Sequence, residues 1–298
     1  MEQGKFWKFH DKNYKKLLIV PALILIFSFA FMGYFYSVHH DFISKDISLT
    51  GGTSITLNDP NINANQLQKD MSGKLQDVNT RSIYDLITQK QVAVVLETKT
   101  DAQTTKTTLQ DYLGYSLTDQ NSSIQFTGSN ISQSFYEQLL IAVLFAFFFM
   151  SIVVIIIYRS FIPAFAVILS AFADIFMALT VVNVFNIQVS SAGIIAFLML
   201  IGYSVDTDIL LTNKVLRSKE KTREAVNKNI TRAFKTGITM TLTAIAAVAF
   251  CLIIIGSFSN ILSQIFTILI IGLFFDIINT WITNVCIVKW YTESKEKK

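Results

Sequence analysis

Six apolar stretches, each about 20 residues or longer, dominate this chain of 298 residues. A helix rises about 1.5 Å per residue, so roughly 20 apolar residues cross the hydrocarbon core of a bilayer. Charged residues make up only 15% of the chain, whereas soluble domains carry about 25%. The sequence therefore predicts a polytopic α-helical membrane protein with six transmembrane helices. They are expected at residues 17–36, 135–158, 161–182, 189–212, 236–256 and 261–290.

The basic residues predict how these helices are oriented. Five lysines lie in residues 1–16, eight Lys or Arg residues lie in the loop 213–235, and three lysines lie in the tail 291–298. The positive-inside rule places all three segments, and so both termini, on the cytoplasmic side of the cell membrane. The first span lacks a small-residue cleavage site and is predicted to be a signal anchor.

Apolar residues recur at helical spacing within the basic loop 213–235, at Ala225, Val226, Ile230 and Phe234. This pattern predicts an amphipathic helix that lies on membrane lipid at the inner surface. The alternative is a basic anchor without that helix.

Residues 37–134 are polar and are expected outside the membrane as a separate domain. Two glycines, Gly51 and Gly52, interrupt its first strand and predict a bulge or the close approach of another backbone. The order of elements is βαββαβ, which predicts a ferredoxin-like α+β domain between the first and second spans. The expected elements are a strand at 47–57, a helix at 63–78, a hairpin at 81–97, a helix at 101–113 capped by Asp101, and a strand at 123–127.

The net charge of this domain argues against a nucleic-acid partner. Residues 41–133 contain ten acidic and seven basic residues, a net charge of −3, so the remainder of the chain carries +7. A nucleic-acid-binding patch in such a domain is expected to be basic.

Four carboxylates lie inside predicted spans: Asp174 in the third, Asp206 and Asp208 in the fourth, and Asp276 in the sixth. An ionisable group in hydrocarbon costs at least roughly 2.5–3.5 kcal/mol, so it needs a partner, a water-filled cavity or a function. Such acids can relay protons. Alternatively, each is protonated and hydrogen-bonded to Asn279, Thr280 or a backbone carbonyl, and only locks the helices together.

Asp206 and Asp208 are expected to point to nearly opposite sides of their helix, because a helix turns about 100° per residue. Only one of them can therefore face the interior. We favour Asp206 as the acid whose charge matters, because the small residues Gly202 and Ser204 precede it and allow another helix to pack closely. The fifth span, which is rich in threonine and alanine, is expected to lie beside it.

Cysteine and histidine positions predict neither a metal nor a cofactor. Cys251 and Cys286 fall inside apolar spans, and the three histidines lie outside them without metal-binding spacing.

The whole pattern resembles the SecF family of protein-export membrane proteins within the resistance-nodulation-division (RND) superfamily, and archaeal members most. The resemblance rests on Leu-Thr-Gly-Gly-Thr at 49–53, on Gly202, Tyr203, Ser204, Val205 and Asp206 in the fourth span, and on residues 275–280. Bacterial members continue Gly-Tyr-Ser-Val with Asn-Asp, which puts their acid at the position of Thr207. The SecD partner has its acid at the position of Asp206.

The resemblance implies an accessory subunit of the Sec machinery, not an enzyme. It implies a SecD-like partner, the Sec translocon and a translocating polypeptide as partners. Asp174, Asp206, Asp208 and Asp276 are the candidates for proton or ion coupling, and the resemblance adds Arg232, which matches an arginine that the family uses with such acids. RND machines pair two six-span halves, and one half without an internal repeat needs a second.

Two other functions fit less of the sequence. An RND exporter of lipids or small molecules normally carries both halves in one chain. An intramembrane aspartyl protease would show Tyr-Asp in one span and Gly-x-Gly-Asp in the next, but here Asp174 follows Ala173 and Asp206 follows Val205.

Overall fold

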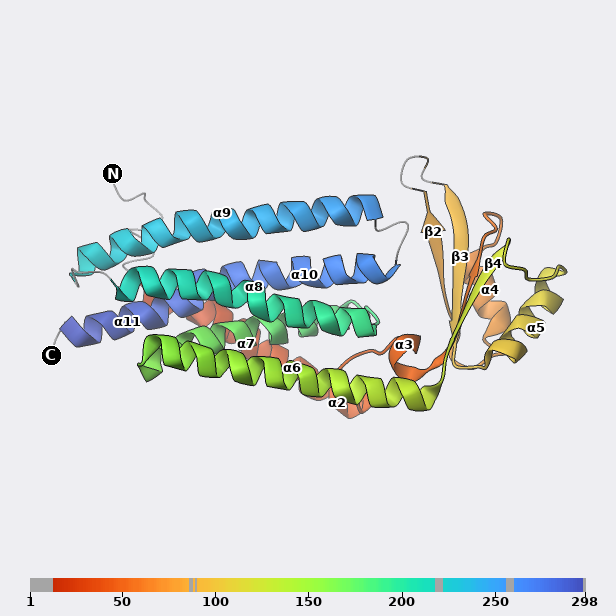
Figure 1. Ribbon diagram of the computed structural model, residues 1–298, viewed down its shortest axis with the longest axis horizontal. Coiled ribbons are helices and arrows are strands. Elements are labelled where there is room, and N and C mark those ends of the chain that lie inside the picture. Colours follow the sequence, from red (N-terminus) through yellow and green to blue (C-terminus); the bar gives the residue numbers. More distant parts are fainter. Residues whose placement is uncertain (1–12, 86–87, 89, 218–221, 256–259, 297–298) are drawn as a thin grey trace.

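Long helices and one small sheet divide the chain into two parts. The computed structural model describes residues 13–85, 88, 90–217, 222–255 and 260–296. The helices lie side by side in a bundle, and a small α+β domain is attached at one end, the domain end (Figure 1). Tyr14 donates a hydrogen bond of 2.6 Å to Glu293, so both ends of the described chain lie together at the opposite end, the far end (Figure 1).

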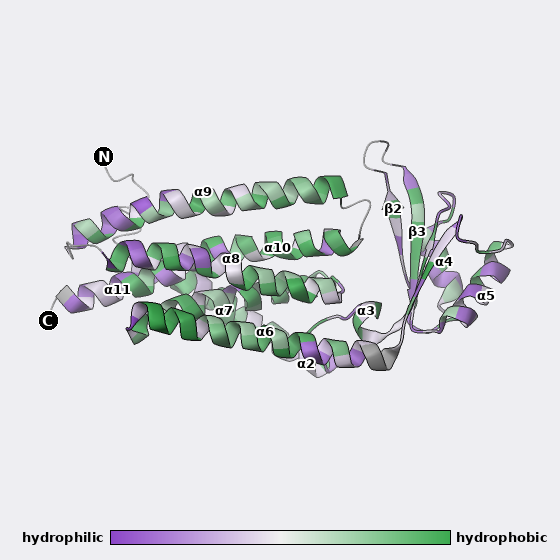
Figure 2. Ribbon diagram, in the orientation of Figure 1, coloured by the Kyte–Doolittle hydropathy of each residue, from purple (hydrophilic) through white to green (hydrophobic). Residues whose placement is uncertain are grey.

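Six helical segments of the described chain are long and apolar enough to cross a membrane. They overlap all six stretches that the sequence predicted as spans, although the fourth helix begins at Ser191 and not at residue 189, and residue 256 lies outside the described residues. They are mainly hydrophobic in Figure 2. The first five are α2 (Ile19–His39), α6 (Ser129–Tyr158), α7 (Phe161–Val184), α8 (Ser191–Leu216) and α9 (Arg223–Ile255), and the sixth consists of α10 (Asn260–Ile278), the π-helix η1 (Asn279–Asn284) and α11 (Val285–Glu296).

The helices α7 and α8 form the centre of the bundle. In the most apolar 18-residue stretch of α7 and of α8, 56% of the residues are buried. In the corresponding stretches of α6 and α9, only 6% are buried. The helix α8 packs against α6, α7, α9 and α10. Polar side chains on the inner faces of α7 and α8 are therefore enclosed by protein.

The predicted helix in the basic loop is confirmed as the start of α9, but its predicted position on membrane lipid is wrong. The helix α8 continues to Leu216, and α9 runs without a break from Arg223 into its apolar part, so most of the predicted loop 213–235 is helical. Val226, Ile230 and Ala233 are buried in one cluster with residues of α8 and α11. The apolar stripe covers neighbouring helices instead of lipid. Lys219 and Lys221 lie outside the described residues.

A four-stranded antiparallel sheet forms the α+β domain, with strand order β2-β3-β1-β4. Along the chain the elements follow in the order that the sequence predicted. Leu67 and Leu109 from the two helices pack with Ile55 and Leu96 of the central strands. The elements are β1 (Gly52–Leu57), α4 (Ala64–Met71), β2 (Asn79–Tyr84), β3 (Gln91–Thr98), α5 (Ala102–Leu113) and β4 (Ser122–Thr127).

The start of this domain differs from the prediction of a strand over 47–57. Residues Ile47–Thr50 form one helical turn, α3, because the Asp46 side chain caps it by accepting a hydrogen bond of 2.7 Å from the Ser48 amide. Gly52 has φ of 143°, and a Cβ atom there would overlap the Thr98 carbonyl oxygen. The predicted close approach of another backbone is thus confirmed at Gly52.

Candidate functional site

Three carboxyl groups from three helices gather inside the bundle. Asp174 of α7, Asp208 of α8 and Asp276 of α10 have no exposed surface. Among the described residues, no lysine or arginine forms an ion pair with any of them. Their hydrogen bonds therefore come from neutral donors.

Asp174 is held by two such donors. The Ser204 hydroxyl donates to Oδ2 at 2.5 Å, and the Asn279 amide donates to Oδ1 at 2.7 Å. Ser204 comes from α8 and Asn279 from η1, so this carboxyl group joins three helices.

Thr280 lies within hydrogen-bond distance of the other two carboxylates. Its hydroxyl oxygen is 2.9 Å from Asp208 Oδ1 and 3.1 Å from Asp276 Oδ1. A hydroxyl group has one hydrogen to donate, so Thr280 can bond only one of the two acids at a time. Thr207 is shared in the same way between Asp276, at 3.0 Å, and the Ser204 carbonyl oxygen, at 2.9 Å.

Not every buried acceptor in this cluster is paired. The Asn284 amide donates to Asp208 Oδ1 at 2.7 Å, but Asp208 Oδ2 and Asn284 Oδ1 are buried without a hydrogen-bond partner among the described residues. An unpaired buried acceptor costs about 1–3 kcal/mol. Because a protonated carboxyl group donates as well as accepts, a proton held in the cluster would lower this cost.

The π-helix η1 supplies three of the donors that bond the buried acids. Its residues Asn279, Thr280 and Asn284 all form hydrogen bonds with the acids. π-Helical turns are rare in proteins, and those that occur are often at functional sites. Asn279 and Thr280 were expected to bond the buried acids, and they do. Asn284 and Thr207 were not expected, although a polar side chain inside an apolar span was a signal available for both.

Asp206, the acid that the sequence analysis favoured, lies outside this cluster. It is on the exposed side of α8 with Gly202 and Tyr203, whereas Ser204 and Asp208 are fully buried. The two acids do point to opposite sides, as predicted, but it is Asp208 that faces the interior. Ser204 and Asp208 lie on the same face of α8 as the buried apolar residue Leu211, and this face points inward.

Arg232 is likewise remote from the buried acids. It lies on the exposed side of α9, where its carbonyl oxygen accepts a hydrogen bond of 3.5 Å from Lys214 Nζ. The same ammonium group donates to the Thr236 hydroxyl at 2.9 Å. Arg232 therefore belongs to the surface between α8 and α9 and not to the acid cluster.

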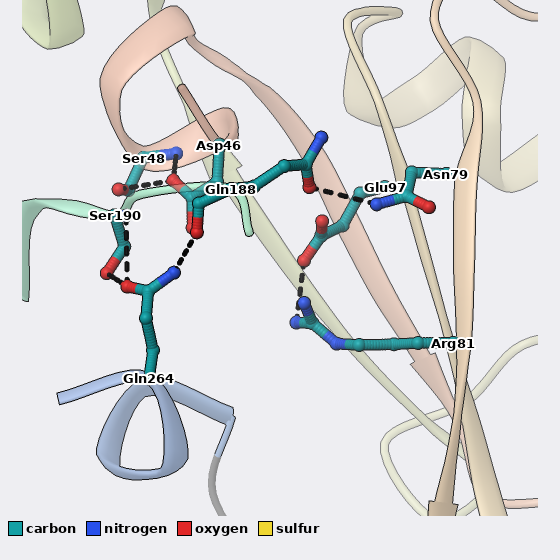
Figure 3. A network of polar contacts seen from close by, with 8 residues as sticks. All are labelled: Asp46, Ser48, Asn79, Arg81, Glu97, Gln188, Ser190 and Gln264. Atoms are coloured by element: carbon teal, nitrogen blue, oxygen red, sulfur yellow. Dashed lines mark hydrogen bonds and ion pairs between the residues drawn. The ribbon is translucent and has the colours of Figure 1, made fainter. Parts of the chain in front are cut away.

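A second polar network joins the α+β domain to the bundle (Figure 3). Asn79 of β2 donates to the Gln188 side chain at 2.9 Å, and Gln264 of α10 bonds both Gln188 and Ser190. A parallel bridge between Lys45 and Val189 lies beside them. A cavity of about 580 Å³ opens at this junction. The loop between α7 and α8 thus holds the domain in place.

Glu97 of β3 borders this junction as a buried acid, paired with Arg81 at 2.7 Å. Burial raises the pKa of the Glu97 carboxyl group above its ordinary value of 4.5, and Arg81 only partly opposes this. As the pH rises above 4.5, the unfolded chain releases this proton before the folded chain does, so stability falls. We expect Glu97→Gln to gain stability relative to the unmodified protein over that interval.

The comparison is to be made by hydrogen exchange of the β3 amides in the full chain between pH 4 and 8. Asp70 and Asp101, whose pKa values are lowered by hydrogen bonds from Tyr112 and Thr104 respectively, act in the opposite direction. Both aspartates are present in both proteins, so their effect on the free energy of unfolding cancels when Glu97→Gln is compared with the unmodified protein. A difference that stays constant with pH would contradict the prediction.

Comparisons with known proteins place these features in context. Residues 112–294 match the family described as protein export membrane protein SecD/SecF, C-terminal. The protein-export membrane protein SecF of Methanocaldococcus jannaschii is 38% identical over 96% of this chain and 99% of its own. The SecF of Pyrococcus furiosus is 32% identical over 95% and 93%.

A solved structure shares the whole fold. The crystal structure of SecDF, a translocon-associated membrane protein from Thermus thermophilus, superposes with a TM-score of 0.76 at 15% sequence identity. The match covers 100% of this chain but 39% of that one, so the other protein contains much that this chain lacks.

Proposed function

This chain belongs to the SecD/SecF family of protein-export membrane proteins, and we propose that it is an accessory subunit of the Sec machinery that works with a SecD-like partner. The observation that carries the proposal is the likeness to SecF proteins along nearly the entire chain. We propose that it assists a translocating polypeptide at the Sec translocon in the cell membrane.

The exposed surface between α8 and α9 is evidence for a second membrane subunit. Asp206 and Gly202 lie on α8, and exposed Thr239 and Thr243 lie on α9. Lipid chains offer no hydrogen-bond partner to a carboxyl group, whereas small and hydroxyl residues favour close packing of helices. We propose that the SecD-like half covers this surface, which we call the partner face, and that it provides the partner of Asp206.

We propose further that all six segments cross the membrane and that both termini are cytoplasmic. The C-terminal end of α8 and the N-terminal end of α9 lie toward the far end (Figure 1). These ends carry exposed Lys214, Arg217, Lys228 and Arg232, and the positive-inside rule places them inside. The α+β domain would then be extracytoplasmic, as a ferredoxin-like domain between the first and second spans.

The buried acids support coupling to an ion gradient. We propose that protons enter and leave the cluster of Asp174, Asp208 and Asp276, because shared hydroxyl donors and bare acceptors let its hydrogen bonds rearrange when a proton moves. No observation on the described residues favours the exporter or the protease.

The partner is tested with a matched pair of glycines. Gly202 on the partner face and Gly33 on α2 are both exposed and both have open space where a side chain would be added. We expect Gly202→Leu to reduce copurification of a coexpressed SecD-like subunit at least about tenfold, a loss of about 1.4 kcal/mol. Gly33→Leu should leave it unchanged.

Both variants should still accumulate in the membrane, which shows that the chain itself folds. Equal copurification of the partner by the two variants would refute the partner face. Failure of the unmodified chain to copurify any SecD-like subunit or translocon component would refute the proposed function itself.

A further inference from the structure

The last span is a helix of two parts joined by the π-helical turn η1. A π-helix forms hydrogen bonds from residue i to i+5, so it accommodates more residues than an α-helix over the same length. One residue corresponds to about 100° of rotation and about 1.5 Å of rise in an α-helix. If η1 closed into a regular α-helix, α11 would therefore turn by about 100° relative to α10 and shift by about 1.5 Å along the helix axis.

Polar contacts hold the span on the domain side of η1. The Gln264 side chain of α10 accepts from the Ser190 amide at 3.0 Å and also bonds Gln188. A side chain at Gly272 would overlap Leu200 of α8, so α10 and α8 are in close contact. The rotation of α10 is thereby fixed.

A separate set of contacts holds α11 at the far end. Lys289, which is 1% exposed, donates to the Asn227 side chain of α9 at 2.9 Å. Glu293 accepts from Tyr14, and Tyr291 is 2.7 Å from the Ser160 hydroxyl oxygen. The two parts of the span are thus held independently, and η1 takes up the difference between them.

The acids contact η1 directly. Thr280 and Asn284 bond Asp208, and Asn279 bonds Asp174. These three residues lie within one turn and a half, so their hydrogen bonds depend on the local winding of the helix. The titratable groups that face Asp208 from the surrounding helices are Asp174, Asp276 and Tyr158.

We infer that η1 is a register joint: the carboxyl group of Asp208 holds its π-helical turn open through Thr280 and Asn284, and exchange of these hydrogen bonds lets the turn tighten and rotates α11. This rests on the proposed ion coupling and states how that coupling reaches the far end. A proton at Asp208 changes which atoms donate, the turn rewinds, and the contacts of α11 with α9 and the N-terminal segment shift.

Distances between pairs of spin labels test the joint, with the labels placed outside η1 and outside the residues that bond it. The far-end pair replaces exposed Lys228 of α9 and exposed Trp290 of α11 with cysteine. The control pair replaces exposed Ile195 of α8 and exposed Ile261 of α10. Cys251 and Cys286 are first changed to serine, and the distances are measured with Asp or Asn at position 208.

We expect Asp208→Asn, which fixes a neutral side chain with its own amide donors, to shift the far-end distance by about 5 Å or more, given a helix diameter of about 10–12 Å. The control distance should not change. Deletion of Ile282, a partly buried residue of η1 without a polar side chain, should give the shifted far-end distance with either residue at position 208.

If Asp208→Asn leaves the far-end distance unchanged, the joint is wrong, even where the deletion variant fails to fold. Loss of export in Asp208→Asn with an unchanged distance would refute the joint and leave ion coupling intact. A shifted distance with normal export would support the joint and refute the coupling.

Discussion

Export is expected to fall to less than about a tenth in Asp208→Asn, while the protein still accumulates and still binds its SecD-like partner. The asparagine keeps the shape of the side chain and an oxygen that accepts from Thr280 or Asn284. It cannot take up and release a proton, so a cycle that depends on Asp208 stops. Translocation of a secretory protein in cells or vesicles measures the loss, and quantitative pull-down measures the partner.

Asp208→Leu should behave differently. It removes the carboxylate acceptor of the Asn284 amide and one of the two acceptors of Thr280, and it puts an apolar side chain among polar groups; an unpaired buried group costs about 1–3 kcal/mol. The protein should therefore fail to accumulate.

Asp206→Asn distinguishes the two acids of α8. Normal export by Asp208→Asn together with lost export by Asp206→Asn would show that Asp206 is the acid whose charge matters and that the buried cluster only locks helices.

Gly52→Ala is expected to destabilise the α+β domain strongly. The added Cβ atom would overlap the Thr98 carbonyl oxygen of the neighbouring strand, and φ of 143° is a conformation that alanine rarely adopts. Strain of this kind costs about 1–3 kcal/mol before the overlap is counted, so we expect a loss of about 3 kcal/mol or more. Amide exchange in β1 and β3 of the full chain should accelerate a hundredfold or more.

Gly73→Ala is the matched control, because no atom lies within 4 Å of the position that its Cβ would take. Its exchange rates should match those of the unmodified chain. If the β1 amides of Gly52→Ala exchange as slowly as those of the unmodified chain, strands β1 and β3 accommodate the added Cβ atom without loss of stability, and the prediction is wrong.

The sequence predicted the spans because lipid imposes a simple rule of length and polarity, and it located α5 because Asp101 caps the first turn with hydrogen bonds to Gln103 and Thr104. The prediction that Val226 and Ile230 face lipid was wrong, because helical spacing shows which residues share a face of a helix but not what covers that face. The same limit applied to Asp206 and Asp208. Periodicity separated the two acids, and only packing against α7 and α10 decides which one is buried.

The π-helical turn was beyond prediction for a different reason. Residues Asn279–Asn284 have no spacing that distinguishes a π-helix from an α-helix. The contacts of α11 beside the turn depend on residues far away in the chain, such as Tyr14 and Asn227.

The order of the acids and their donors along the chain also bears on biogenesis. Asp174 and Asp208 belong to the third and fourth candidate spans, but Asn279, Thr280 and Asn284 are synthesised more than 60 residues after Asp208. Each acid must therefore enter the membrane before most of its hydrogen-bond donors exist, and it must wait there as a neutral, protonated group or in contact with water. The bundle becomes complete only when the final span docks, so a chain that stops short of η1 carries exposed polar groups by which a membrane protease could recognise it as unfinished.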